Sequence, residues 1–148
     1  MGIRRKTREL VLQALYQGEL LKKPAPEQFS LFAENFQLNQ KVVPLAKEFL
    51  AALYYRLADI DSTIQTHAEN WRLDRMSVVD RNIIRIAVYE MIYCKDIPAS
   101  VSINEAIEIA KKFSSDDAGP FINGVLDAIR KAQESDPVQQ AKKQKKTP

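Results

Sequence analysis

The sequence has little cysteine, histidine and glycine, and each shortage narrows what the protein can be. Of its 148 residues, one is cysteine, Cys94, one is histidine, His67, and four are glycine. A single cysteine excludes an internal disulfide and a cysteine-based zinc cluster. We expect Cys94 to be a buried, unreactive thiol, as free cysteines usually are. We expect His67 to be an exposed or hydrogen-bonded surface residue, because it has no neighbour at metal-ligand spacing. The scarcity of glycine and of alternating β-branched runs favours helices over strands.

Patterns that accompany catalysis are also missing. The sequence has no glycine-rich phosphate loop, no metal-ligand spacing and no nucleophile paired with a histidine. Its acidic residues are scattered over expected helix ends and polar faces. We therefore expect a protein that is not an enzyme and that uses neither a cofactor nor a metal.

Long hydrophobic runs are absent as well. The charged N-terminus is followed by no apolar segment of the kind that a secretory signal needs. Lys6 stands where a myristoylation pattern requires serine or threonine. No stretch approaches the length of a membrane span. We expect a cytoplasmic protein that does not enter a membrane.

Charge is present in ordinary amount but is unevenly distributed. The net charge is +3, yet residues 1–23 carry +4 and residues 136–148 carry +3, which leaves −4 for residues 24–135. A neutral-to-acidic body with basic ends is typical of a protein that binds a polyanion through one end.

The N-terminal basic residues are the best candidates for such contacts. Arg4, Arg5 and Arg8 occur within two helical turns, with Lys6 beside them. Guanidinium groups bind phosphates bidentately. On charge alone, nucleic-acid binding and a basic terminus that merely aids solubility are equally well supported.

Helical periodicity dominates the chain, and its strongest stretch is residues 77–94. Ser77 suits the N-cap of this helix, and Asp80 lies in the first turn, at the positive end of the helix dipole. Apolar residues cover more than one side of the helix: Val78, Ile83, Ile84, Ile86, Ala87, Val88, Tyr89, Met91 and Ile92. A helix apolar on several sides must be surrounded. We therefore predict an all-α fold, a single bundle of about seven helices around the central buried helix 77–94.

Other periodic segments predict the helices that surround this one. We expect them over residues 3–22, 26–37, 40–69 with a break near 58–62, 103–113 and 120–133. Ser102 and Glu105 have capping-box spacing, with Val101 and Ala106 as a hydrophobic staple. Together these helices make one domain, residues 1–135. Glutamine, lysine and proline dominate residues 136–148, which we expect to be a disordered basic tail.

Three features of the aromatic and glycine residues concern the core. Phe29, Phe32 and Phe36 recur at helical spacing and are expected to pack inside. Trp71 is expected to fill the core between helices, with stacking on a nucleic-acid base as the less favoured alternative. Asn123–Gly124 lies inside the last helix, where glycine costs about 1 kcal/mol relative to alanine. Close packing of another helix, or close approach of a ligand, would explain that glycine.

Five segments spread over residues 4–130 carry a family resemblance. They are residues 4–16 (RRKTRELVLQALY), 79–90 (VDRNIIRIAVYE), 96–98 (DIP), 103–111 (INEAIEIAK) and 121–127 (FINGVLD). Through them the chain resembles the bacterial transcription antitermination factors of the NusB family. The family's fold is an all-helical bundle, in agreement with the periodicity.

This resemblance implies a role and the residues that perform it. Family members pair with the ribosomal protein NusE, and the pair binds single-stranded boxA RNA. That complex helps the RNA polymerase elongation complex through ribosomal RNA operons. By matching positions, the resemblance implies RNA contacts at Arg4, Arg5, Lys6, Arg8, Asp117, Phe121 and Asn123. It implies contacts with NusE at Tyr16 and Asp80.

One departure and two alternatives accompany the resemblance. Relatives commonly carry a basic residue just before the phenylalanine, whereas this chain has Gly119–Pro120, so a phosphate contact is lost there. A similar domain opens certain ribosomal RNA cytosine methyltransferases, but the 148 residues hold no second, cofactor-binding domain. A helical scaffold or dimerisation module that never touches RNA is the alternative function, and the sequence leaves a homodimer open.

Overall fold

The computed structural model describes residues 2–35, 40–68 and 71–135. Within these ranges it contains seven α-helices, one 3-10 turn and no strand. The elements are α1 (Ile3–Leu21), α2 (Ala25–Asn35), α3 (Val42–Tyr55), α4 (Leu57–His67), η1 (Leu73–Arg75), α5 (Val78–Tyr93), α6 (Ala99–Phe113) and α7 (Ala118–Ser135). The predicted all-α fold is confirmed. The predicted tail, residues 136–148, and Phe36 lie outside the described residues.

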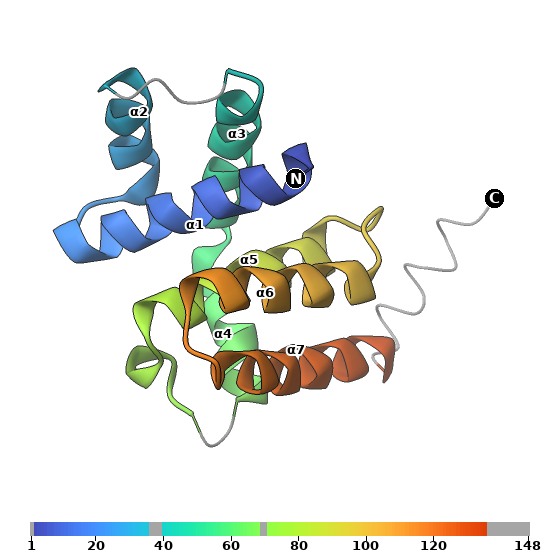
Figure 1. Ribbon diagram of the computed structural model, residues 1–148. Coiled ribbons are helices and arrows are strands. Elements are labelled where there is room, and N and C mark those ends of the chain that lie inside the picture. The colour runs from blue at the N-terminus through green and yellow to red at the C-terminus, as the bar shows by residue number, and fades with distance from the viewer. Residues whose placement is uncertain (1, 36–39, 69–70, 136–148) are drawn as a thin grey trace.

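The helices form two groups that meet at α1 and α5. Helices α2 and α3 pack on α1, while α4, α6 and α7 pack on α5. Figure 1 shows α2 and α3 above α1, with α5, α6 and α7 layered below it. Because α1 also contacts α5 directly, these two helices join the halves. The N-terminus of α1 and the start of α7 lie at opposite ends of α6 in this view (Figure 1).

Helix α5 is the centre of the lower group, as its sequence predicts. Its core residues Ile84 and Val88 are fully buried. At its start, the backbone N–H of Asp80 donates to Ser77 Oγ at 3.0 Å, so the predicted N-cap is confirmed. Such a cap typically contributes about 1 kcal/mol.

The start of α6 differs from the prediction. The helix begins at Ala99, directly after Pro98, and not at the capping box that Ser102 and Glu105 suggest. Proline suits the entry to a helix because its missing N–H would have no intrahelical partner there. Ser102 is consequently inside the helix, where its Oγ is buried without a hydrogen-bond partner among the described residues. The predicted staple is also wrong, because Val101 is 40% exposed.

Two further expectations are corrected. The break in the segment 40–69 falls at Arg56, two residues before the predicted range 58–62. Trp71 does not fill the core: 58% of its surface is exposed, and its ring contacts Phe121 of α7 from outside. His67 is half-buried, and its Nδ1 lies 2.9 Å from the Thr63 carbonyl oxygen, consistent with a hydrogen-bonded histidine.

Candidate nucleic-acid and partner interfaces

The four basic side chains at the start of α1 have very different surroundings. Arg4 and Lys6 are exposed, and neither forms an ion pair with a residue of the described ranges. Arg5 is half-buried, and its Nε and Nη2 donate to the two carboxylate oxygens of Glu105 in α6, at 2.7 and 2.9 Å. The free positive charge of this segment therefore comes from Arg4 and Lys6.

Arg8 is enclosed by the fold. It is 4% exposed, and its Nε and Nη2 donate to the carboxylate of Glu90 in α5 at 2.9 and 2.8 Å. A second carboxylate, that of Glu105, lies 3.8 Å from its Nη1. This guanidinium ties the first turns of α1 to α5 and α6, so the phosphate contact predicted for Arg8 has no exposed donor.

Sequence reasoning missed these two carboxylates. Glu90 had a recognisable signal, because it is a charged residue inside a helix that is apolar on several sides. Charged residues are rarely buried unless they are paired. Glu105 had no such signal, since its spacing from Ser102 suggests a capping box. The hydrogen bond from Arg5 lowers the pKa of Glu105, and the same pairing raises the pKa of Arg5.

The residues predicted near the start of α7 do not form one cluster. Asp117 and Asn123 are exposed, and Phe121 is half-buried. Since successive residues turn by about 100° around an α-helix, Phe121 and Asn123 lie about 160° apart around α7. Gly119, one turn before Asn123, faces Ile107 of α6. Asn123 therefore lies on the α6 side of α7, and Phe121 lies on the opposite side.

Phe121 instead meets Trp71. The two rings are in edge-to-face contact, with centroids 5.4 Å apart and an interplanar angle of 68°. This geometry is favourable for aromatic pairs. The sequence does not predict the contact, because Trp71 precedes α5 and Phe121 lies two helices later. The only hint was an aromatic residue followed closely by Arg72 and Arg75.

The residues predicted to meet a protein partner lie on two helices, α1 and α5, that contact each other. Tyr16 of α1 is 40% exposed. Asp80 of α5 is half-buried and accepts a hydrogen bond from Ser114 Oγ at 2.5 Å. Between them, an ion pair of 2.6 Å from Arg81 to Glu19 joins α5 to α1. Leu20, one turn after Tyr16 and also exposed, extends this face and was not predicted.

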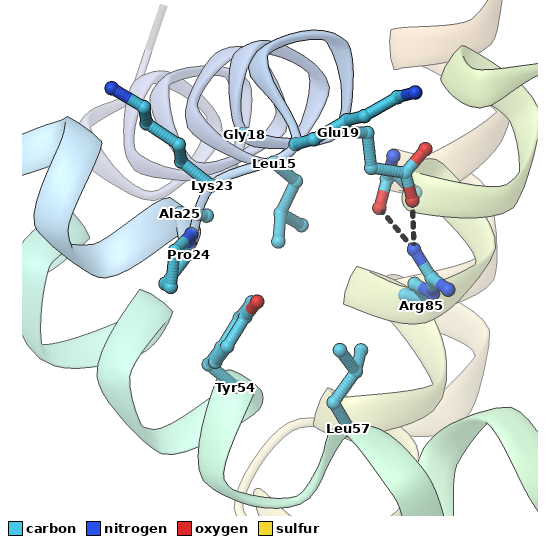
Figure 2. A pocket seen from close by; sticks show the side chains of 11 residues that line it. Leu15, Gly18, Glu19, Lys23, Pro24, Ala25, Tyr54, Leu57 and Arg85 are labelled. Carbon is cyan, nitrogen blue, oxygen red and sulfur yellow. Dashed lines mark hydrogen bonds and ion pairs between the residues drawn. The ribbon is translucent and has the colours of Figure 1, made fainter.

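Beside this face is a largely half-buried charge network that borders a cavity of about 410 Å³. Figure 2 shows Glu19 and Arg85 on one side of the cavity, and Tyr54 and Leu57 on another. Arg85 donates to Glu19 at 2.5 Å and to Asp61 at 2.8 and 2.9 Å. Burial acts to raise the pKa of Glu19, but the hydrogen bonds from Arg81 and Arg85 outweigh it and lower that pKa. Likewise, burial acts to lower the pKa of Arg85, and its carboxylate partners raise it overall.

Other kinds of site find no support in the part of the chain that the structure describes. No group of three histidine, cysteine or acidic side chains there could hold a metal ion. Among the same residues, no helix is both long and apolar enough to span a bilayer. Cys94 is half-buried rather than buried, and burial raises the pKa of its thiol.

Comparison with known proteins decides the family. The model of the NusB family matches residues 5–131. The chain belongs to the NusB family. The transcription antitermination protein NusB of Desulfatibacillum aliphaticivorans is 43% identical over 129 residues, covering 87% of this chain and 90% of the relative. That of Myxococcus xanthus is 41% identical over 133 residues, covering 87% and 95%. The predicted resemblance is confirmed.

Solved NusB structures share the fold. NusB of T. maritima is 38% identical, with a TM-score of 0.77 over 86% of this chain and 90% of that one. A crystal structure of the antitermination factors NusB and NusE in complex with double-stranded RNA contains a chain that is 30% identical. Its TM-score is 0.78, over 89% of this chain and 98% of that one.

On this NusB-family fold, the candidate residues form three surfaces. The basic end consists of Arg4 and Lys6, with Arg5 beside them. The partner face consists of Tyr16, Leu20 and Asp80. The aromatic site consists of Trp71 and Phe121.

Proposed function

We propose that this chain is a transcription antitermination factor that binds RNA together with the ribosomal protein NusE. One observation carries the proposal: 89% of this chain matches 98% of a chain from a crystal structure of NusB and NusE in complex with double-stranded RNA. The names of its relatives as transcription antitermination proteins support the same role. The chain would act by binding rather than by catalysis, in the cytoplasm.

In this proposal the basic end contacts phosphates. Arg4 and Lys6 are exposed and carry unneutralised charge, which is what a polyanion requires. Arg5 shares its charge with Glu105 and remains partly accessible. Arg8 holds these turns in place through Glu90. Its contribution to RNA binding is therefore indirect.

At the start of α7, Phe121 stacks on an unpaired base, while Asp117 and Asn123 offer polar groups to base edges. Because Phe121 and Asn123 lie on different sides of α7, the RNA crosses the start of this helix.

The partner face binds NusE, with Tyr16 and Asp80 as contacts. Together these contacts recognise boxA RNA and deliver the pair to the RNA polymerase elongation complex on ribosomal RNA operons.

A titration of single-stranded boxA RNA, with and without NusE, tests the proposal. We expect measurable binding by the chain alone, tighter binding with NusE, and weaker binding of a scrambled RNA of equal length. The double variant Arg4→Ala/Lys6→Ala should lose affinity in both conditions. If the chain bound NusE but bound no RNA, either alone or together with NusE, the scaffold function would replace the proposed one.

A further inference from the structure

Trp71 is an exposed tryptophan that the fold holds in place. Its backbone N–H donates to the Ala68 carbonyl oxygen at 3.0 Å. The side chain of Gln65 in α4 then binds the turn on both sides. Its Nε2 donates to the Trp71 carbonyl oxygen at 3.3 Å, and its Oε1 accepts from the Leu73 N–H at 2.9 Å. The turn that presents this ring is therefore anchored to α4.

Packing does not account for this ring, because more than half of Trp71 faces solvent. Its contact with Phe121 leaves it as the outer member of an edge-to-face pair. Tryptophan is highly buried on average, and it is enriched at binding interfaces. The pair presents two rings at different angles: that of Phe121 is half-buried, and that of Trp71 is exposed to solvent.

The surroundings of the aromatic site suit a nucleic acid. Arg72 and Arg75 are exposed next to Trp71, and the pairing of Arg72 with Asp74 is an exposed one at 3.2 Å. Such pairs are weak and are easily exchanged for phosphate. On α7, Gly124 lies one turn after Phe121 and about 60° from it around the helix. A Cβ at Gly124 would meet nothing within 4 Å, so helix packing does not explain this glycine. Because Gly124 has no side chain, the surface of α7 beside Phe121 is open to a ligand.

We propose that Trp71 is a base-stacking residue, and that the open face of its ring, beside the flank of α7, takes an unpaired base of the bound RNA, with Arg72 next to its phosphate. This inference rests on the proposed function and extends it. The RNA would run from the basic end along α6 and beyond the start of α7, to Trp71. Stacking requires an open base face, so the site takes single-stranded and not fully paired RNA.

Trp71 is the one tryptophan of the chain, so its fluorescence reports directly on the site. We would titrate the full chain with single-stranded boxA RNA while following tryptophan emission, and measure binding independently with an end-labelled RNA. Quenching that tracks binding is expected. A fully paired duplex of the same sequence should bind without that quenching.

The variant Trp71→Ala should bind single-stranded RNA about 5- to 150-fold more weakly, the loss expected for one base–aromatic stack, and Trp71→Phe should restore most of the affinity. Tyr55→Ala is the matched control, because Tyr55 is a highly exposed aromatic at the end of α3. It should bind as wild type. Melting curves of each variant show whether affinity is compared between folded molecules.

Two results would overturn the inference while leaving the proposed function intact. One is RNA binding with unchanged emission and equal affinity in Trp71→Ala. The other is quenching by NusE alone, which would make Trp71 a protein contact. If wild-type protein failed to bind any RNA in the labelled assay, the proposed function would fail first, and the stacking role with it.

Discussion

At the scale of single residues, burial separates basic side chains that look equivalent in the sequence. Arg4 and Arg8 are one turn apart on α1, yet Arg4 faces solvent and Arg8 lies in a carboxylate-lined interior. An exposed arginine can exchange water for phosphate at little cost. A buried arginine cannot leave its partner without leaving a buried charge unpaired.

The first prediction contrasts these two arginines. Arg4→Ala should weaken RNA binding and reduce the salt slope by about one unit, with stability unchanged. Arg8→Ala should lower the free energy of unfolding by about 3–5 kcal/mol, because it leaves Glu90 buried without its partner. Urea unfolding and RNA titrations at several salt concentrations measure both effects. An Arg8→Ala protein of wild-type stability with a reduced salt slope would reverse the assignment.

The second prediction concerns pH and Glu19. The pKa of this carboxylate is lowered from its ordinary value of 4.5 by Arg81 and Arg85. A lowered pKa in the folded state adds stability above about pH 4.5, and that stability is lost as the pH falls further. The stability difference between wild type and Glu19→Gln should therefore be largest at pH 6–7 and shrink towards pH 3. Urea unfolding at these pH values measures it.

A matched control for Glu19 is Glu108→Gln, which removes an exposed ion pair with Lys111. Exposed pairs contribute little to stability, so this variant should stay within about 0.5 kcal/mol of wild type throughout. A pH-independent difference for Glu19→Gln would show that packing, and not charge, makes this residue important.

At the scale of elements, glycines in two helices have different surroundings: one is closely packed and the other faces open space. A Cβ at Gly18 in α1 would lie 3.0 Å from the Ala25 backbone and from the Lys23 carbonyl oxygen. The glycine therefore lets α2 turn back closely against α1. Gly124 in α7 has no such neighbour, and its helix gains nothing from lacking a side chain.

The third prediction follows from that contrast. Gly18→Ala should destabilise the protein by about 1–3 kcal/mol, because the backbone of the α1–α2 connection must move. Gly124→Ala should stabilise it by up to about 1 kcal/mol, through helix propensity alone. Thermal melts of the two single variants decide the point. Destabilisation by Gly124→Ala would contradict this prediction, because it would mean that a side chain at position 124 interferes with the packing of α7.

At the scale of the whole molecule, the basic end and the partner face occupy different parts of one rigid helix, α1. The basic end lies at its first turns, and Tyr16 and Leu20 lie near its last turns. Arg8, through Glu90, and Glu19, through Arg81, fasten both regions of α1 to α5. The basic end and the partner face therefore share no residue.

The fourth prediction tests this separation. Asp80→Lys should weaken NusE binding, because it reverses a charge on the partner face, while RNA binding by the isolated chain should stay nearly as in wild type. Some stability, about 0.3–1 kcal/mol, should be lost at the N-terminus of α5, so circular dichroism must show a folded variant. Equal losses of RNA and NusE binding in a folded protein would mean that the surfaces are not independent.

Much of this architecture was predictable because its causes are local. The N-cap at Ser77 and the apolar sides of α5 depend on residues within a few turns of one another, and so does the existence of a break between α3 and α4, although not its position. Where two local signals competed, at Pro98 and Ser102, the sequence suggested the later start and the proline set the earlier one.

The sequence by itself determined the helices, the central place of α5 and the family to which the chain belongs. The tertiary structure alone decided which polar and aromatic residues are available to a ligand. Arg5 and Arg8 are neutralised by carboxylates 100 and 82 residues away, and Trp71 is exposed beside a helix that begins far along the chain. Periodicity assigns residues to one face of a helix, but burial depends on which other helices cover that face.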